Sequence, residues 1–179
     1  CLDCLGASVG KSAEDILKTC VQPKGEPPIA GASRAYDGQN GVLLASHWPL
    51  QNPETLRLRA SFSNRVAVFA TIQPEGYEPI EVACTHLSTW TPAPPNHPDF
   101  YSWDDEMIAQ VDAISKWLKK RAVNNRPSLF LGDMNAGPEI GDNISEEMPK
   151  VWKRIMELRF YSPVTEAKPP FCTTCNSNT

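Results

Sequence analysis

Four short apolar runs constrain the fold more than any other feature of this sequence. They are GVLLAS (41–46), RVAVFATI (65–72), IEVACTHL (80–87) and SLFLGD (128–133), and polar, Gly or Pro residues bound each of them. Apolar runs of this length are typical of buried strands. Because RVAVFATI and IEVACTHL follow each other closely, we expect them to form a hairpin. The chain is therefore predicted to fold around a β-sheet.

Two further segments have the periodicity of amphipathic helices. Residues 102–118 carry an apolar stripe behind a capping box formed by Ser102 and Asp105, and residues 145–158 carry a second stripe with two glutamates in its first turn. The stripes consist of Met107, Ile108, Val111, Ile114 and Leu118, and of Val151, Trp152, Ile155 and Leu158. Strands and helices together predict an α/β domain.

Length and charge limit the possible functions. The 179 residues suffice for one domain with a sizeable core, and we treat residues 1–179 as a single domain and expect a monomer. The net charge of −4 gives no general attraction for nucleic acid, so a nuclease of this composition would need a cation or a local basic patch. No stretch approaches the roughly 20 apolar residues of a membrane span.

The six cysteines form an even set, which fits disulfides in an oxidising compartment. Zinc is the alternative, because CLDC (1–4) and CTTC (172–175) both have C-x-x-C spacing. These two motifs lie at opposite ends of the chain, whereas paired zinc knuckles are usually about 15 to 20 residues apart. We therefore favour disulfides and a secreted protein. Many pairings are possible, and the candidates are Cys4 with Cys20 and Cys172 with Cys175.

Polar residues stand where the apolar runs end. Asp133 closes SLFLGD and Asn135 follows two residues later, so in a strand their side chains would share one face and converge on a cation or a phosphate. A turn is the alternative, because Asp, Asn and Gly are common turn residues. His86 stands near the end of IEVACTHL, and Asn40 precedes GVLLAS. An imidazole can transfer protons near neutral pH, and a carboxylate can orient water or bind a hard metal.

Three motifs in order, NGVLLAS, THL and LGDMN, resemble the endonuclease/exonuclease/phosphatase superfamily, whose fold is that of deoxyribonuclease I. The resemblance implies a four-layer α/β sandwich of two mainly antiparallel sheets flanked by helices. It also implies hydrolysis of phosphate esters with Mg2+, or with Mn2+ or Ca2+. Asp133 would then bind the metal side and activate water, and Asn135 would bind phosphate and hold Asp133. His86 would contact the phosphate or assist the leaving group, and Asn40 would support the metal and the substrate.

The chain departs from the family pattern in three places. The Gln-Glu pair that ends an early strand and binds metal is absent, as is the C-terminal Asp-His pair, and His47 stands where many relatives have Arg. We expect a fragment trimmed at both ends, with little or no activity by itself.

The expected function of the whole protein is secreted, metal-dependent hydrolysis of phosphodiesters, and we favour a nuclease. The alternatives are a sphingomyelin-type phosphodiesterase and a non-catalytic binding domain. An exposed aromatic loop at residues 88–103 (STWTPAPPNHPDFYSW) would favour the sphingomyelin substrate. A Pro-braced surface crossover is the other interpretation of that loop.

Overall fold

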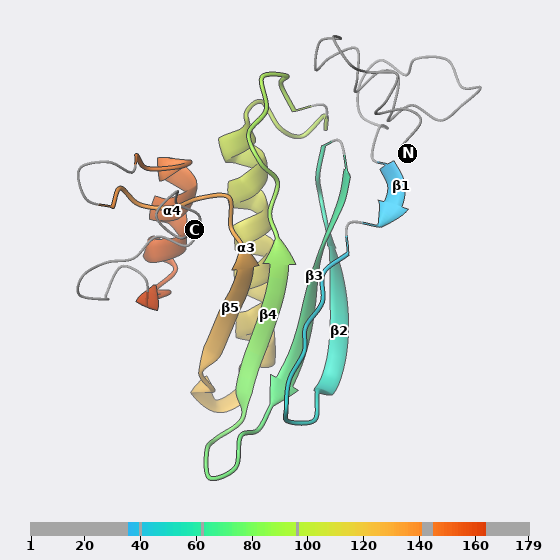
Figure 1. The fold of residues 1–179 in the computed structure, drawn as a ribbon, viewed down its shortest axis with the longest axis vertical. Helices are drawn as coiled ribbons and strands as arrows, with labels where there is room; N and C mark the ends of the chain where they lie inside the picture. Colours follow the sequence, from blue (N-terminus) through green and yellow to red (C-terminus); the bar gives the residue numbers. More distant parts are fainter. Residues whose placement is uncertain (1–35, 40, 62, 96, 141–144, 164–179) are drawn as a thin grey trace, which may run out of the picture.

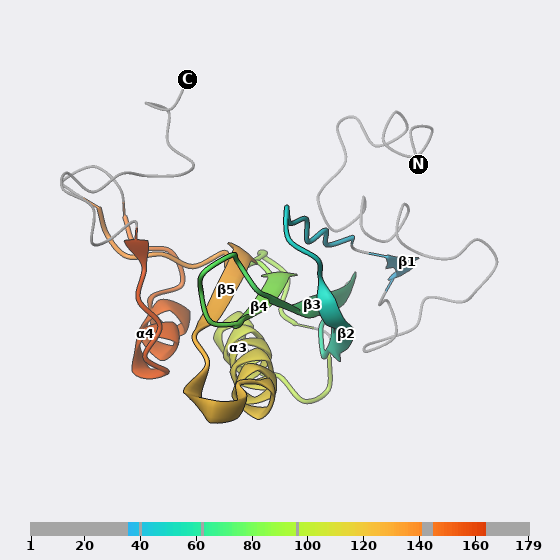
Figure 2. The same ribbon diagram turned by 90° about the horizontal axis from the view of Figure 1, so that it is seen from below.

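The structure is a computed structural model that describes residues 36–39, 41–61, 63–95, 97–140 and 145–163. These residues form a mixed sheet with helix α3 (Trp103–Arg121) against one face and helix α4 (Pro149–Glu157) beside it. Figure 1 shows the sheet with α3 behind it, and Figure 2 shows α3 and α4 side by side below the strands. The predicted α/β class is confirmed.

The strands of the sheet come mostly from the predicted apolar runs. Their bounds are β1 Tyr36–Gln39, β2 Gln51–Leu58, β3 Ser63–Ile72, β4 Ile80–His86 and β5 Ser128–Asp133. β3 pairs antiparallel with β2 and with β4, which confirms the predicted hairpin, and β4 pairs parallel with β5. The short β1 pairs parallel with the start of β3. A crossover through α3 joins the parallel pair, as parallel strands require.

One prediction about the region before β3 is wrong, and one strand in this region was not predicted. Residues 41–46 form no strand, and Leu43 is 85% exposed. The segment instead runs beside the sheet, where Leu44 and Leu50 line a shallow cavity together with Val68 and Ala70 of β3. The strand in this region is β2, which has no apolar run because it lies at the sheet edge and exposes most of its side chains. Edge strands also tolerate a proline, here Pro53.

Helix α3 has the predicted start and the predicted buried stripe. The hydroxyl of Ser102 accepts a hydrogen bond from the backbone N–H of Asp105 at 3.2 Å, which caps the first turn. Four of the five stripe residues are buried in the core together with Phe69 and Ala83 of the sheet and Leu87 directly after β4, and Ile108 packs at the border of the core. The four are Met107, Val111, Ile114 and Leu118.

Helix α4 begins later than predicted. Pro149 occupies the first helical turn, where its missing N–H costs nothing, and Met148 before it has a left-handed backbone. Glu147 therefore precedes the helix and forms a bridge with Gly137 instead of a first turn. Val151 and Ile155 are buried, as the periodicity predicted.

Two buried carboxylates join α3 to the sheet. Near the C-terminal end of the helix, Glu81 of β4 forms ion pairs with Arg121 at 3.1 Å and with Arg126 at 3.3 Å. Near the N-terminal end, Glu106 of α3 accepts hydrogen bonds from Ser61 and Ser88. A buried charge is tolerated only with such partners. Both ends of the helix are thus held in register with the strands.

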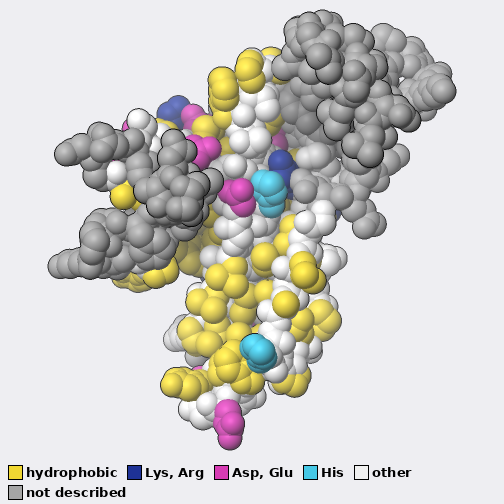
Figure 3. Space-filling view, viewed as in Figure 1, with side chains coloured by type: hydrophobic (Ala, Val, Ile, Leu, Met, Phe, Trp, Pro, Cys, Tyr) yellow, Lys and Arg dark blue, Asp and Glu magenta, His cyan; other side chains and the backbone are white. Residues whose placement is uncertain are grey.

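The sheet face opposite α3, here called the open face, is covered only in part by other described residues. Leu129 and Leu131 of β5 are each 42% exposed, and Figure 3 shows apolar side chains spread over this face below the strand ends. The second sheet of the predicted sandwich is not among the described residues, which contain the one sheet above. No helix in the described part of the chain is both long and apolar enough to cross a membrane.

Gly132 allows β4 and β5 to approach each other just before the polar strand ends. Its φ is +120°, and a Cβ at this position would lie 1.8 Å from the carbonyl oxygen of Thr85. We expect Gly132→Ala to lower the free energy of unfolding by more than about 2 kcal/mol, because the strained backbone alone costs about 1 to 3 kcal/mol. Chemical denaturation measures this change.

Gly137→Ala is the matched control, because a Cβ there meets no atom within 4 Å. We expect it to change the free energy of unfolding by about 0.5 kcal/mol or less. Equal stability of the two variants would contradict the close approach at Gly132.

Candidate active site

His86 and Asp133 lie at the adjacent ends of two parallel strands. The register of β4 and β5 pairs them directly, so their side chains point to the same face of the sheet. His86 Nε2 lies 3.7 Å from Asp133 Oδ2, and both side chains are partly exposed. Figure 3 shows a histidine and an acidic side chain side by side at this end of the open face. A polar pair that solvent reaches can meet a substrate.

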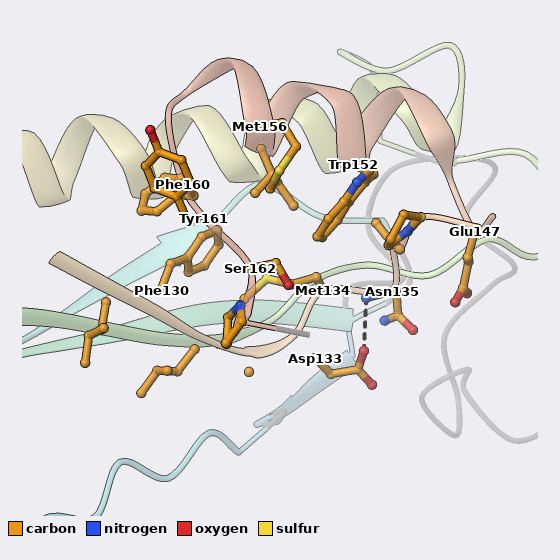
Figure 4. A pocket seen from close by; sticks show the side chains of 18 of the residues that line it. Phe130, Asp133, Met134, Asn135, Glu147, Trp152, Met156, Phe160, Tyr161 and Ser162 are labelled. Atoms are coloured by element: carbon orange, nitrogen blue, oxygen red, sulfur yellow. Dashed lines mark hydrogen bonds between the residues drawn. The ribbon is translucent and has the colours of Figure 1, made fainter. Parts of the chain in front are cut away.

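Asn135 reaches the same place through a turn. β5 ends at Asp133, and Asn135 has a left-handed backbone with φ of 45°. Its backbone N–H donates to Asp133 Oδ1 at 2.9 Å, which is the dashed bond in Figure 4, and its Nδ2 donates to the carbonyl oxygen of Leu87 at 3.0 Å. We predicted that Asp133 and Asn135 converge because they share one face of a strand, and that reason is wrong. The Asp-Asn turn itself forms the polar cluster, so turn and site are not alternatives.

Arg65 of β3 is a neighbour that the sequence did not reveal. Its Nη1 donates to the carbonyl oxygen of His86 at 3.3 Å. Burial lowers the pKa of Arg65, and the nearby carboxylates of Glu106 and Asp133 oppose that shift. Charged residues are common at the start of apolar strands, so the position of Arg65 in the sequence did not indicate a place in the site. A guanidinium here provides the positive charge that phosphate oxygens favour.

The surroundings of His86 favour its neutral form. Burial lowers the pKa of the imidazole from its ordinary value of 6.5, the positive charge of Arg65 lowers it further, and Asp133 opposes both. His86 is therefore mainly neutral at pH 7. A neutral imidazole can donate a hydrogen bond from one ring nitrogen and accept a proton at the other.

The site fits a metal ion only in part. Asp133 offers one carboxylate and Asn135 one amide oxygen, and among the described residues no group of three or more His, Cys, Asp or Glu side chains could hold an ion. Mg2+ commonly binds through one or two carboxylates and keeps several waters. Asp133 could therefore supply one of the ligands of such an ion. The predicted ligand Asn40 lies outside the described residues.

A cavity of about 810 Å³ opens beside Asp133, between β5 and α4. Its walls are mostly aromatic and aliphatic, and Asp133, Asn135 and Glu147 stand at one end, as Figure 4 shows. The apolar part is lined by Phe130, Trp152, Met156, Phe160 and Tyr161, among others. Polar groups at one end and an apolar wall at the other are typical of binding sites for organic ligands.

The predicted disulfide candidates Cys4, Cys20, Cys172 and Cys175 lie outside the described residues, so their pairing stays a prediction. Among the described residues, Cys84 is a free thiol. Burial raises its pKa, so it is not an activated nucleophile.

The solved structures that partly match this one include two bacterial proteins. Sphingomyelinase C from Streptomyces griseocarneus is 14% identical with a TM-score of 0.49, and the match covers 66% of this chain and 38% of that one. A mutant of beta toxin from Staphylococcus aureus with bound magnesium ions is 19% identical with a TM-score of 0.45, covering 63% of this chain and 36% of that one. The chain therefore spans well under half the length of either protein. No curated protein matches it significantly.

The family comparison covers almost the whole chain. The model of the endonuclease/exonuclease/phosphatase family matches residues 9–178, which include the motifs NGVLLAS, THL and LGDMN and the residues Asn40, His86, Asp133 and Asn135. His86, Asp133 and Asn135 lie within this match and within one cluster of the structure. The chain belongs to the endonuclease/exonuclease/phosphatase family.

Proposed function

We propose that the chain supplies part of the active site of a metal-dependent phosphodiesterase. The observation that carries this proposal is the convergence of His86, Asp133 and Asn135 at the ends of β4 and β5, beside Arg65. A carboxylate, an imidazole, an amide and a guanidinium are the groups that orient water and bind phosphate oxygens.

Each group has a role that its contacts support. Asp133 Oδ1 is held by the N–H of Asn135, which leaves Oδ2 to orient a water molecule and accept its proton as the water attacks phosphorus. One N–H of the Asn135 amide binds Leu87, and the other can bind a phosphate oxygen. His86 and Arg65 would bind the oxygens whose negative charge grows as the ester bond breaks.

Asp133 is the described residue that we propose as a metal ligand, together with Asn40 from outside the described part. A bound Mg2+ would supply further positive charge to the phosphate. Mn2+ or Ca2+ remain the alternatives predicted from the family.

Two exposed aromatic residues support a phospholipid head group as the substrate. Trp90 is 60% exposed and Tyr101 is 93% exposed, both in the loop between β4 and α3. The indole of Trp103 donates to the carbonyl oxygens of Thr91 and Ala93, which braces this loop. Trp and Tyr are favoured at membrane surfaces. The two exposed aromatic residues thus favour the sphingomyelin-type alternative. The nuclease remains a prediction from the sequence.

The substrate is tested with the full-length native protein. We expect Mg2+-dependent hydrolysis of a generic phosphate bis-ester, abolished by EDTA and restored by excess Mg2+. Sphingomyelin vesicles, DNA and RNA in parallel distinguish the phospholipid and nuclease alternatives. Hydrolysis of none of them would support the binding-domain alternative. Secretion and a monomeric state are separate proposals, which fractionation of the native source and light scattering would test.

A further inference from the structure

A buried polar network lies beside the candidate site, near the N-terminal end of α3. At its centre is the fully buried carboxylate of Glu106, and Gln110 follows one turn later on the same helix face. Ser61, between β2 and β3, and Ser88, after β4, both donate hydrogen bonds to this carboxylate. An isolated buried carboxylate would be very unfavourable, so these bonds are required by its burial.

Ser88 is held by both its side chain and its backbone. Its hydroxyl donates to Glu106 Oε1 at 2.5 Å, and its backbone N–H donates to Gln110 Oε1 at 2.9 Å. Gln110 Nε2 donates in return to the Ser88 hydroxyl at 2.8 Å. Three hydrogen bonds to two buried side chains of α3 therefore fix one residue of the segment after β4.

Only Leu87 separates this fixed residue from His86, and Leu87 binds the other two site residues. Its backbone N–H donates to the carbonyl oxygen of Asp133 at 3.0 Å, and its carbonyl oxygen accepts from Asn135 Nδ2 at 3.0 Å. A displacement of Ser88 would move the peptide groups on both sides of Leu87. It would thereby change the placement of His86 relative to Asp133 and Asn135.

We propose that Glu106 and Gln110 are positioning residues, which hold the end of β4 through Ser88 so that His86, Asp133 and Asn135 keep their relative placement. This inference rests on the proposed function. Neither residue touches the candidate substrate position, since both are buried. Catalytic groups displaced by about 1 Å can lose roughly 10²-fold in rate, so such support has a measurable effect.

Ser61 and Ser88 form a matched pair for a test. Both are buried, and each hydroxyl donates to the Glu106 carboxylate at 2.5 Å. Ser88→Ala and Ser61→Ala therefore each remove one bond to this carboxylate, but only Ser88 belongs to the segment that carries His86, whereas Ser61 precedes β3, which carries Arg65. We expect similar decreases in melting temperature for the two variants. We expect kcat to fall about 10- to 100-fold for Ser88→Ala alone, with KM changed by about twofold or less.

The same variants are compared by NMR, which needs no substrate. We expect Ser88→Ala to shift the side-chain amide resonances of Asn135, which donates to Leu87, and Ser61→Ala to leave them in place. Equal losses of kcat in the two variants would overturn the positioning role. If the native protein hydrolyses no phosphodiester, the proposed function fails. The positioning role is then tested by the Asn135 resonances alone. An equal response of those resonances in both variants would overturn the inference.

Discussion

Replacement of Asp133 by Asn is expected to reduce Mg2+-dependent phosphodiester hydrolysis by about 10³-fold or more in the full-length protein. The amide has the shape of the carboxylate but can neither accept the proton of water nor supply negative charge. Single preorganised groups contribute about 10²- to 10³-fold in rate, and proton transfer contributes about 10²- to 10⁴-fold. Steady-state kinetics on the best substrate measures the loss.

Stability is not expected to change much in this variant. Asp133 is largely exposed, and its hydrogen bond from Asn135 can be kept by an amide oxygen. Asp112→Asn is the control, because it alters a partly exposed carboxylate of α3 that pairs with Arg154 away from the site. Near-wild-type activity of Asp133→Asn would mean that the proposed mechanism is wrong, and the binding-domain alternative would then be preferred.

His86→Ala is expected to lower kcat by about 10²-fold, because the phosphate loses a group that stabilises its growing charge. The neutral imidazole next to Arg65 is suited to donate a hydrogen bond to a phosphate oxygen. Because β4 remains paired with β3 and β5 up to this residue, we expect the variant to fold. Single-turnover kinetics with thermal melts as control would measure the effect.

His86→Gln distinguishes the two roles left open for this residue. A Gln side chain can donate a hydrogen bond from about the position of Nε2 but cannot transfer a proton. If His86 acts by contacting phosphate, as we expect, Gln should recover about tenfold of the loss seen with Ala. Equal losses with Gln and Ala would indicate proton transfer to the leaving group. A rate for His86→Ala within about threefold of wild type would remove His86 from the mechanism.

The parts of the fold that were predictable are those with a strong burial pattern. β3 and β4 bury neighbouring residues and so carry continuous apolar runs, whereas α3 buries one face, so its apolar residues recur with the helical period. β2 has no apolar run because it is an exposed edge strand. Residues 41–46 have an apolar run that wrongly predicts a strand, because they lie beside the sheet without pairing with it. The start of α4 was predicted too early, because the two glutamates before Pro149 resemble a first helical turn. In the structure the helix begins at Pro149.

The sequence by itself determined that His86 and Asp133 stand at the ends of two strands and that Asn135 follows Asp133. Tertiary structure decided the rest of the site. Pairing of β4 with β5 sets the 3.7 Å approach of His86 to Asp133, and the guanidinium of Arg65 reaches the carbonyl oxygen of His86 from β3. These contacts join segments far apart in the chain. They depend on the register of β4 and β5, which no tight turn fixes because a crossover through α3 joins the two strands, and on the buried bonds of α3.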